Sequence, residues 1–230
     1  MKDRLIVALD TINKREALRL VERLYPLVRI FKVGSVLFTS YGPGIIKEIR
    51  KKGGRIFFDL KFHDIPKVVA GAVENAAKMG VEMTTVHTLG GEEMLKAAVQ
   101  AVQKIKPRPR ILAVSILTSL EDRDLKRLGL KGMCLDEVKR LACLAVGCGV
   151  DGIVASAREV KSLRKILPPS SLIVTPGIRP AGKGLGDQKR TMTPREAIDA
   201  GADYLVIGRP ITQAKDPRKA AEDILADIRS

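Results

Sequence analysis

The chain has 230 residues, of which 45% are hydrophobic and 29% are charged. This balance is enough to bury one substantial core, and it excludes both a disordered chain and one embedded in a membrane, since no apolar stretch approaches the roughly 20 residues that span a bilayer. The net charge of +15 favours anionic ligands. The bases are spread along the chain, however, and aromatic residues make up only 3%, so we expect no specific nucleic-acid binding.

The N-terminus and the cysteines favour the cytoplasm. Met1–Arg4 mixes an acid with bases, and Leu5–Leu9 is too short an apolar run for the core of a signal peptide. The three cysteines, Cys134, Cys143 and Cys148, form no Cys-x-x-Cys pair, so we expect buried, reduced thiols. We therefore expect a cytoplasmic protein.

Short apolar runs alternate with segments of helical periodicity along the whole chain. The runs predict strands at Leu5–Leu9, Ile30–Val36, Arg55–Lys61, Met83–His87, Ile111–Leu117, Gly152–Ala155, Leu172–Thr175 and Tyr204–Gly208. The segments between them predict helices at Lys14–Leu24, Pro43–Lys51, Pro66–Met79, Glu92–Lys104, Leu135–Val146, Glu159–Leu167, Pro194–Ala200 and Arg218–Ile228. Continuous apolar strands are typical of a buried parallel sheet. Eight such units without a linker predict an α/β protein, a single-domain (β/α)8 TIM barrel over residues 1–230.

A doubly wound open sheet is the alternative architecture. Its first turn would carry glycines that approach a dinucleotide, whereas here the first strand leads into Asp10-Thr11-Ile12-Asn13. The longest connection, Thr118–Leu135, has no strong pattern of its own, which is compatible with a mobile loop over the site.

Charged and polar residues gather where the predicted strands end. In a barrel, these ends surround the active site. The residues concerned are Asp10, Lys32, Asp59, Lys61, His87, Thr118, Arg179 and Arg209. Packing alone does not explain so many charged groups, so we expect the functional site at this end.

Asp59 and Lys61 lie two residues apart on one strand, so their side chains point to the same face. If Phe57 also lies on that face, the face points into the barrel interior. An ammonium held among carboxylates stays protonated, and it can stabilise developing negative charge and donate a proton. A structural ion pair is the alternative for an isolated Asp-x-Lys. Asp64, which is followed by Ile65-Pro66 at the opening of a helix, favours the chemical interpretation.

Gly208 and Arg209 predict a phosphate site at the end of the last strand. A guanidinium can donate two parallel hydrogen bonds to phosphate oxygens, and a glycine lets backbone N–H groups approach a phosphate closely. Barrels commonly bind phosphate at this position. Gln188 lies beside the glycine-rich stretch Gly182–Gly186, which is suited to closing over a ligand.

The run Phe58-Asp59-Leu60-Lys61-Phe62-His63-Asp64-Ile65-Pro66 resembles the signature of the bacterial orotidine 5′-phosphate decarboxylase family. Other segments agree in order: Val7-Ala8-Leu9-Asp10, Lys32-Val33-Gly34, Leu117-Thr118-Ser119, Thr175–Pro180, Gly186–Arg190 and Val206–Pro210. The resemblance covers essentially the whole chain. It departs at Lys67-Val68, where the bacterial pattern usually continues Asn-Thr, which removes two polar groups beside the site.

The resemblance implies a homodimeric barrel that converts orotidine 5′-phosphate to UMP and CO₂, the last step of de novo pyrimidine nucleotide synthesis, with no metal or cofactor. Lys61 would be the proton donor and Asp59 would lie beside the departing carboxylate. Lys32 and Asp10 would contact the ribose and complete the charge network.

The same resemblance implies a site shared between subunits. Asp64, with Ile65, would reach into the partner's site. Thr118 would lie against the nucleotide, and its base and phosphate end would be held by Arg179, Gln188, Gly208 and Arg209. We interpret His63 as a packing group outside the chemistry. His63 and His87 are so far apart in the sequence that they make only a weak case for a metal site.

Two other functions stay open. A sugar-phosphate enzyme of the same superfamily, such as 3-keto-L-gulonate 6-phosphate decarboxylase or hexulose 6-phosphate synthase, would share the Asp-x-Lys-x-x-Asp arrangement but use Mg²⁺ bound by carboxylates. A non-catalytic barrel would instead bind nucleic acid through its basic surface, and that binding would be sensitive to salt.

Overall fold

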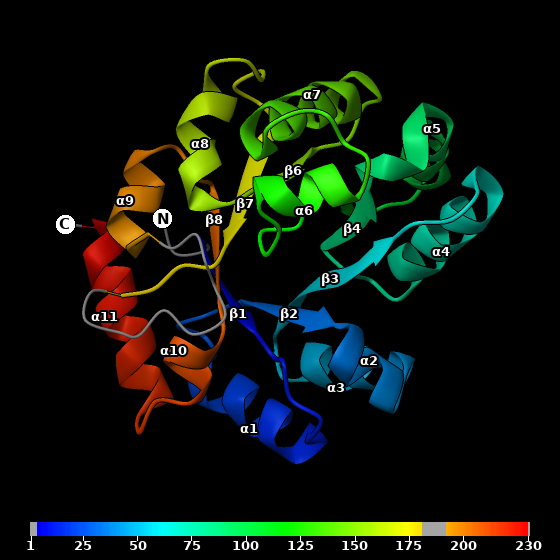
Figure 1. Cartoon of the computed structure of the whole chain (residues 1–230). Coiled ribbons are helices and arrows are strands. Elements are labelled where there is room, and N and C mark those ends of the chain that lie inside the picture. Colours follow the sequence, from blue (N-terminus) through cyan, green and yellow to red (C-terminus); the bar gives the residue numbers. More distant parts are fainter. Residues whose placement is uncertain (1–3, 181–191, 230) are drawn as a thin grey trace.

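The computed structural model describes residues 4–180 and 192–229, and its strands close into a barrel (Figure 1). All neighbouring strands are parallel, and the last pairs with the first. The strands are β1 (Leu5–Ala8), β2 (Ile30–Gly34), β3 (Arg55–Phe62), β4 (Met83–His87), β5 (Arg110–Val114), β6 (Gly152–Val154), β7 (Leu172–Pro176) and β8 (Tyr204–Ile207). The predicted (β/α)8 barrel is confirmed.

Helices connect the strands and surround the barrel (Figure 1). They are α1 (Lys14–Leu24), α2 (Ser35–Tyr41), α3 (Pro43–Lys51), α4 (Pro66–Lys78), the short turn η1 (Thr88–Gly90), α5 (Gly91–Val102), α6 (Asp122–Arg127), α7 (Cys134–Gly147), α8 (Ala157–Arg164), α9 (Pro194–Asp199), α10 (Arg209–Thr212) and α11 (Pro217–Arg229). Across the described ranges, none of these helices has the length and apolar character needed to cross a bilayer.

The strands bury both of their faces. One face of the strands fills the barrel interior with Ile6, Ala8, Ile30, Phe57, Met83, Leu112, Val174 and Val206, and the partly buried Val154 of β6 packs against them. The other face packs against the helices in a larger apolar layer. Successive side chains of a strand alternate between these two layers. The interior-facing positions beyond these apolar residues therefore lie at the carboxyl ends of the strands, where the barrel opens.

The segment after β2 is helical, whereas the sequence predicted that the strand would continue. The predicted strand Ile30–Val36 was wrong at its end, because β2 stops at Gly34 and α2 begins at Ser35. Leu37 of α2 is buried, and Phe38 packs edge-on against Phe58 with ring centroids 4.7 Å apart. The apolar residues that look like a continued strand therefore belong to a helix too short to show its period.

The connection after β5 also differs from the expectation. The predicted strand Ile111–Leu117 ends at Val114, and the connection contains α6, so it is not patternless. Glu121 and Asp124 form a capping box, in which the Glu121 backbone N–H donates to Asp124 Oδ2 at 3.0 Å. Leu125 anchors this helix in the core.

The cysteines are free thiols, and Cys134 and Cys148 are buried as expected. Cys143 is exposed, so the prediction was wrong for this residue. It lies on α7, whose buried side is formed by other positions of the helix, including Leu141 and Ala145.

We predict that Gly152→Ala destabilises the barrel by about 1–3 kcal/mol, because it overpacks a strand. A Cβ at Gly152 would lie 2.3 Å from the backbone oxygen of Leu172 on the neighbouring strand. Gly147→Ala is the matched control, since a Cβ there meets nothing within 4 Å and the residue ends a helix. We expect this change to stabilise the protein by about 0.5–1 kcal/mol. Urea unfolding of the two variants measures both effects, and equal midpoints would contradict the prediction.

Candidate active site

A cavity of about 600 Å³ opens at the carboxyl ends of the strands. It brings together most of the residues predicted for the site: Asp10, Lys32, Asp59, Lys61, Thr118, Arg179, Gly208 and Arg209. They come from strands or strand ends on all sides of the barrel, so closure of the sheet is what assembles them.

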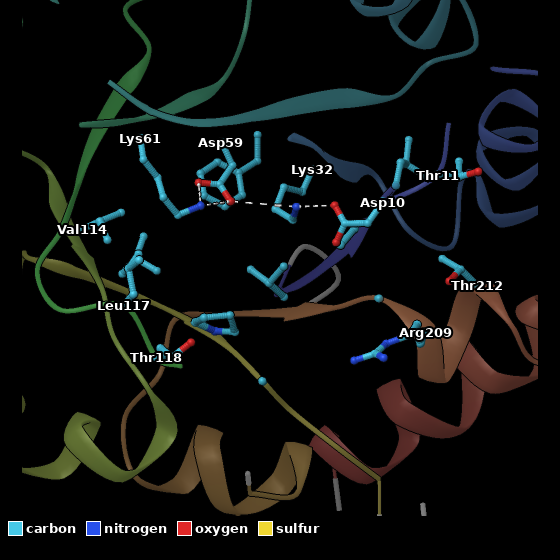
Figure 2. A pocket seen from close by; sticks show the side chains of 18 of the residues that line it. Asp10, Thr11, Lys32, Asp59, Lys61, Val114, Leu117, Thr118, Arg209 and Thr212 are labelled. Carbon is cyan, nitrogen blue, oxygen red and sulfur yellow. Dashed lines mark hydrogen bonds and ion pairs between the residues drawn. The ribbon is translucent and has the colours of Figure 1, made fainter. Parts of the chain in front are cut away.

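Four charges of alternating sign form a row along one wall of the cavity (Figure 2). Lys61 Nζ donates to both carboxylate oxygens of Asp59, at 2.9 and 3.0 Å. Lys32 Nζ lies 3.9 Å from Asp59 Oδ2 and donates to Asp10 Oδ1 at 2.7 Å. Asp59 and Lys32 are the most buried of the four, with side chains 13% and 12% exposed. The row is an ammonium–carboxylate network whose outer ammonium, that of Lys61, faces the cavity.

Phe57, Asp59 and Lys61 lie on the interior face of β3, as the spacing predicts. The strand is not regular, however. Its register against β4 shifts between Phe58 and Phe62, and Lys61 has a φ of 51°, in the left-handed region that residues other than glycine rarely adopt. Backbone strain of this kind is concentrated at functional sites.

Thr85 of β4 is a site residue that the sequence did not indicate. Its hydroxyl accepts a hydrogen bond from the Lys61 backbone N–H at 2.8 Å and donates to Asp59 Oδ1 at 3.0 Å. Alternation along Met83–His87 places Thr85 on the interior face, but a threonine is an ordinary strand residue, so the sequence carries no further signal.

Arg179 and Arg209 supply positive charge to another part of the cavity. Arg209 lies across the cavity from the charged row (Figure 2). Burial, and then the nearby Arg209, lower the pKa of Arg179. An anion bound beside both guanidinium groups would relieve that repulsion. Gly208 leaves adjoining space free, since a Cβ there would meet only Ala8, at 3.5 Å.

Asp64 and Ile65 do not line the cavity of their own barrel. Asp64 is exposed, its Oδ1 accepts only the adjacent Ile65 N–H at 2.7 Å, and it forms no ion pair with a described residue. Ile65 is 65% exposed, and Val68, in the first turn of α4, is 49% exposed. Gln188 and its neighbouring glycine-rich stretch lie outside the described residues.

The two histidines stack on each other with ring centroids 5.3 Å apart. His87 Nδ1 accepts the Leu89 N–H at 3.3 Å. Burial, with smaller effects of His63 and Lys61, lowers the pKa of His87 to about 4, so this ring is neutral near pH 7. Neither histidine lines the cavity, which agrees with a packing role for His63.

Within residues 4–180 and 192–229, no three His, Cys, Asp or Glu side chains are grouped so that they could hold a metal ion. In the cavity wall, the carboxylates of Asp10 and Asp59 instead contact lysine ammonium groups.

Comparison with known proteins agrees with this geometry. Residues 3–224 match the model of the orotidine 5′-phosphate decarboxylase / HUMPS family. The chain belongs to this family. It is 48% identical to the orotidine 5′-phosphate decarboxylase of Moorella thermoacetica, over 99% of this chain and 92% of that protein. It is 49% identical to the enzyme of the same name from Coxiella burnetii, over 99% of this chain and 97% of that protein.

A solved structure of a family member agrees as well. The crystal structure of orotidine 5′-phosphate decarboxylase from Lactobacillus acidophilus superimposes with a TM-score of 0.88 at 36% identity, covering 99% of this chain and all of the other. The resemblance found in the sequence is therefore confirmed at the level of the family and of the fold.

For this member of the orotidine 5′-phosphate decarboxylase family, we predict that His87 weakens the fold in mild acid. The pKa of His87 is about 4 in the folded state and 6.5 for an ordinary histidine, so the unfolded chain binds the proton more readily. Stability therefore falls as the pH drops from 6.5 toward 4. His87→Asn, which keeps an acceptor for the Leu89 N–H, should lose less stability over this interval than the wild type. Parallel curves of unfolding free energy against pH for the two proteins would contradict this.

Proposed function

We propose that the protein is a cytoplasmic orotidine 5′-phosphate decarboxylase, which converts orotidine 5′-phosphate to UMP and CO₂ in the last step of de novo pyrimidine nucleotide synthesis. The observation that carries the proposal is the row Lys61–Asp59–Lys32–Asp10 in a cavity that also holds Arg209. The names of the curated relatives support the same reaction.

Binding begins at the phosphate. Arg209 and Arg179 offer guanidinium groups to the phosphate oxygens, and Gly208 leaves the backbone open beside them. Thr118 lines the cavity against the nucleotide, while Lys32 and Asp10 contact the ribose. Because the phosphate does not react, its binding energy is available to hold the pyrimidine carboxylate against Asp59.

The chemistry follows from the sign of each charge. Asp59 repels the substrate carboxylate, and this repulsion disappears when the C–C bond breaks and CO₂ leaves. The electron pair of that bond stays on the pyrimidine carbon, where the Lys61 ammonium stabilises it. Lys61 Nζ then donates a proton to that carbon, and the resulting amine regains a proton from solvent.

The position of Lys32 favours a reaction without metal over the Mg²⁺-dependent alternative. Its ammonium lies 2.7 Å from Asp10 and 3.9 Å from Asp59, so it occupies the space between the two carboxylates. A divalent cation there would be repelled by Lys32 and would have to displace it from both carboxylates.

We predict that Lys61→Ala lowers kcat on orotidine 5′-phosphate by at least about 10³-fold, because the variant lacks both the proton donor and the positive charge beside the developing carbanion. The assay follows CO₂ release with a chelator present. Lys96→Ala is the control, because that lysine pairs with Glu92 on the surface of α5, and it should keep wild-type activity. An inactive wild type would contradict the proposed function, and activity on orotidine 5′-phosphate that is lost with the chelator and restored by Mg²⁺ would contradict the metal-independent reaction.

We further propose that the active unit is a homodimer in which Asp64 and Ile65 complete the partner's site. Asp64 lies outside its own cavity and pairs with no described cation, so its charge is available to another chain. Ile65 and Val68 expose apolar surface beside it, and a contacting subunit would remove that surface from water. Asp59 and Lys61, by contrast, act within their own barrel.

Co-expressed Lys61→Ala and Asp64→Ala chains test the shared site. Each heterodimer would contain one site with both residues intact, so random pairing should restore about a quarter of the wild-type activity. The control pairs Lys61→Ala with Asp59→Ala. These residues contact each other within one chain, so no intact site can form and activity should stay at the background level. Absence of recovery in the first mixture would contradict the shared site.

A further inference from the structure

The register of β3 against β4 leaves one residue of β4 opposite several of β3. Phe58 pairs with Thr84 and Phe62 pairs with Val86, so Asp59, Leu60 and Lys61 all lie opposite Thr85. A regular ladder cannot continue through such a bulge, and backbone groups of the bulged strand then need other partners.

The Thr85 side chain provides such a partner. Its hydroxyl accepts the Lys61 N–H at 2.8 Å, in place of a backbone carbonyl. The single hydroxyl proton is donated to Asp59 Oδ1 at 3.0 Å. Thr85 is fully buried, so water cannot substitute for either bond. One hydroxyl therefore joins the main chain of Lys61 to the carboxylate of Asp59.

We propose that Thr85 is a positioning residue for the decarboxylation, a role that rests on the proposed function. Lys61 holds a left-handed φ of 51° only while its N–H is bonded inside the bulge. Asp59 keeps both oxygens turned to Lys61 Nζ, at 2.9 and 3.0 Å, while Thr85 fixes one of them from the other side. Without the hydroxyl, the backbone of Lys61 and the carboxylate of Asp59 are each free to turn away from the cavity.

Thr85→Val tests this role, because valine has the shape of threonine without the hydroxyl. We expect kcat to fall by roughly 10- to 100-fold, because a small displacement of catalytic groups from their reactive geometry lowers the rate by about this much. KM and the dissociation constant of UMP should stay within about threefold of wild type, since the phosphate end of the cavity is untouched. Thr85→Ser keeps the hydroxyl and should restore kcat to within about threefold of wild type.

Thr84→Val is the matched control for loss of a buried hydroxyl. Thr84 is the preceding residue of β4, is equally buried and points to the opposite face, and its hydroxyl has no hydrogen-bond partner among the described residues. This variant should retain wild-type kcat. A second comparison, Thr85→Ala against Thr85→Ser, isolates the hydroxyl in smaller side chains.

The outcomes separate the proposals. An active wild type with unchanged kcat in folded Thr85→Val would overturn the positioning role and leave the proposed function intact, whereas an inactive wild type would overturn the proposed function itself. Equal losses of kcat in the valine and serine variants would also overturn the positioning role, because the packing of residue 85 and not its hydroxyl would then matter. If circular dichroism shows that Thr85→Val and Thr85→Ala are both unfolded while Thr85→Ser folds, the hydroxyl serves the fold, and the positioning role is likewise overturned.

Discussion

The ion pair between Asp59 and Lys61 is the interaction on which the site depends. Asp59 is only 13% exposed, and a carboxylate so far removed from water requires compensating partners. The alternating row meets this requirement, because every charge in it has a neighbour of opposite sign. Removal of Asp59 would leave Lys61 without a neighbour of opposite sign in the row, and removal of Lys32 would do the same to Asp10. The four residues are therefore a unit, and the chemical role of one cannot be separated from the placement of the others.

The barrel makes this arrangement possible without a polar core. Apolar residues such as Phe57 and Met83 fill the interior below the site, so the charges are confined to the end where the cavity admits solvent and ligand. Closure of the sheet from β8 back to β1 brings Arg209 and Asp10 into the same cavity, although the sequence separates them by almost the whole chain. The long-range geometry of the site thus follows from strand pairing, and its chemistry from the residues at the strand ends.

Much of this could be predicted from the sequence, because long apolar runs and helices with clear periods report directly on burial. The failures have a common physical origin. The helices α2, α6 and α10 are too short to show a period, and α10 begins at Arg209, where the sequence indicated only the end of a strand. Spacing placed Asp59 and Lys61 on one face, but the shifted register around them arises from pairing with β4, so Thr85 could be recognised only in three dimensions.

The row of alternating charges also gives the cavity a direction. Two ammonium groups and two carboxylates balance, so this row carries no formal net charge, whereas Arg179 and Arg209 give another part of the cavity a positive charge. A ligand with a doubly charged group at one end and a singly charged group at the other has one favourable way to lie between them. The cavity therefore distinguishes head from tail electrostatically before any shape is matched, and a symmetric dianion of similar length would lose that distinction.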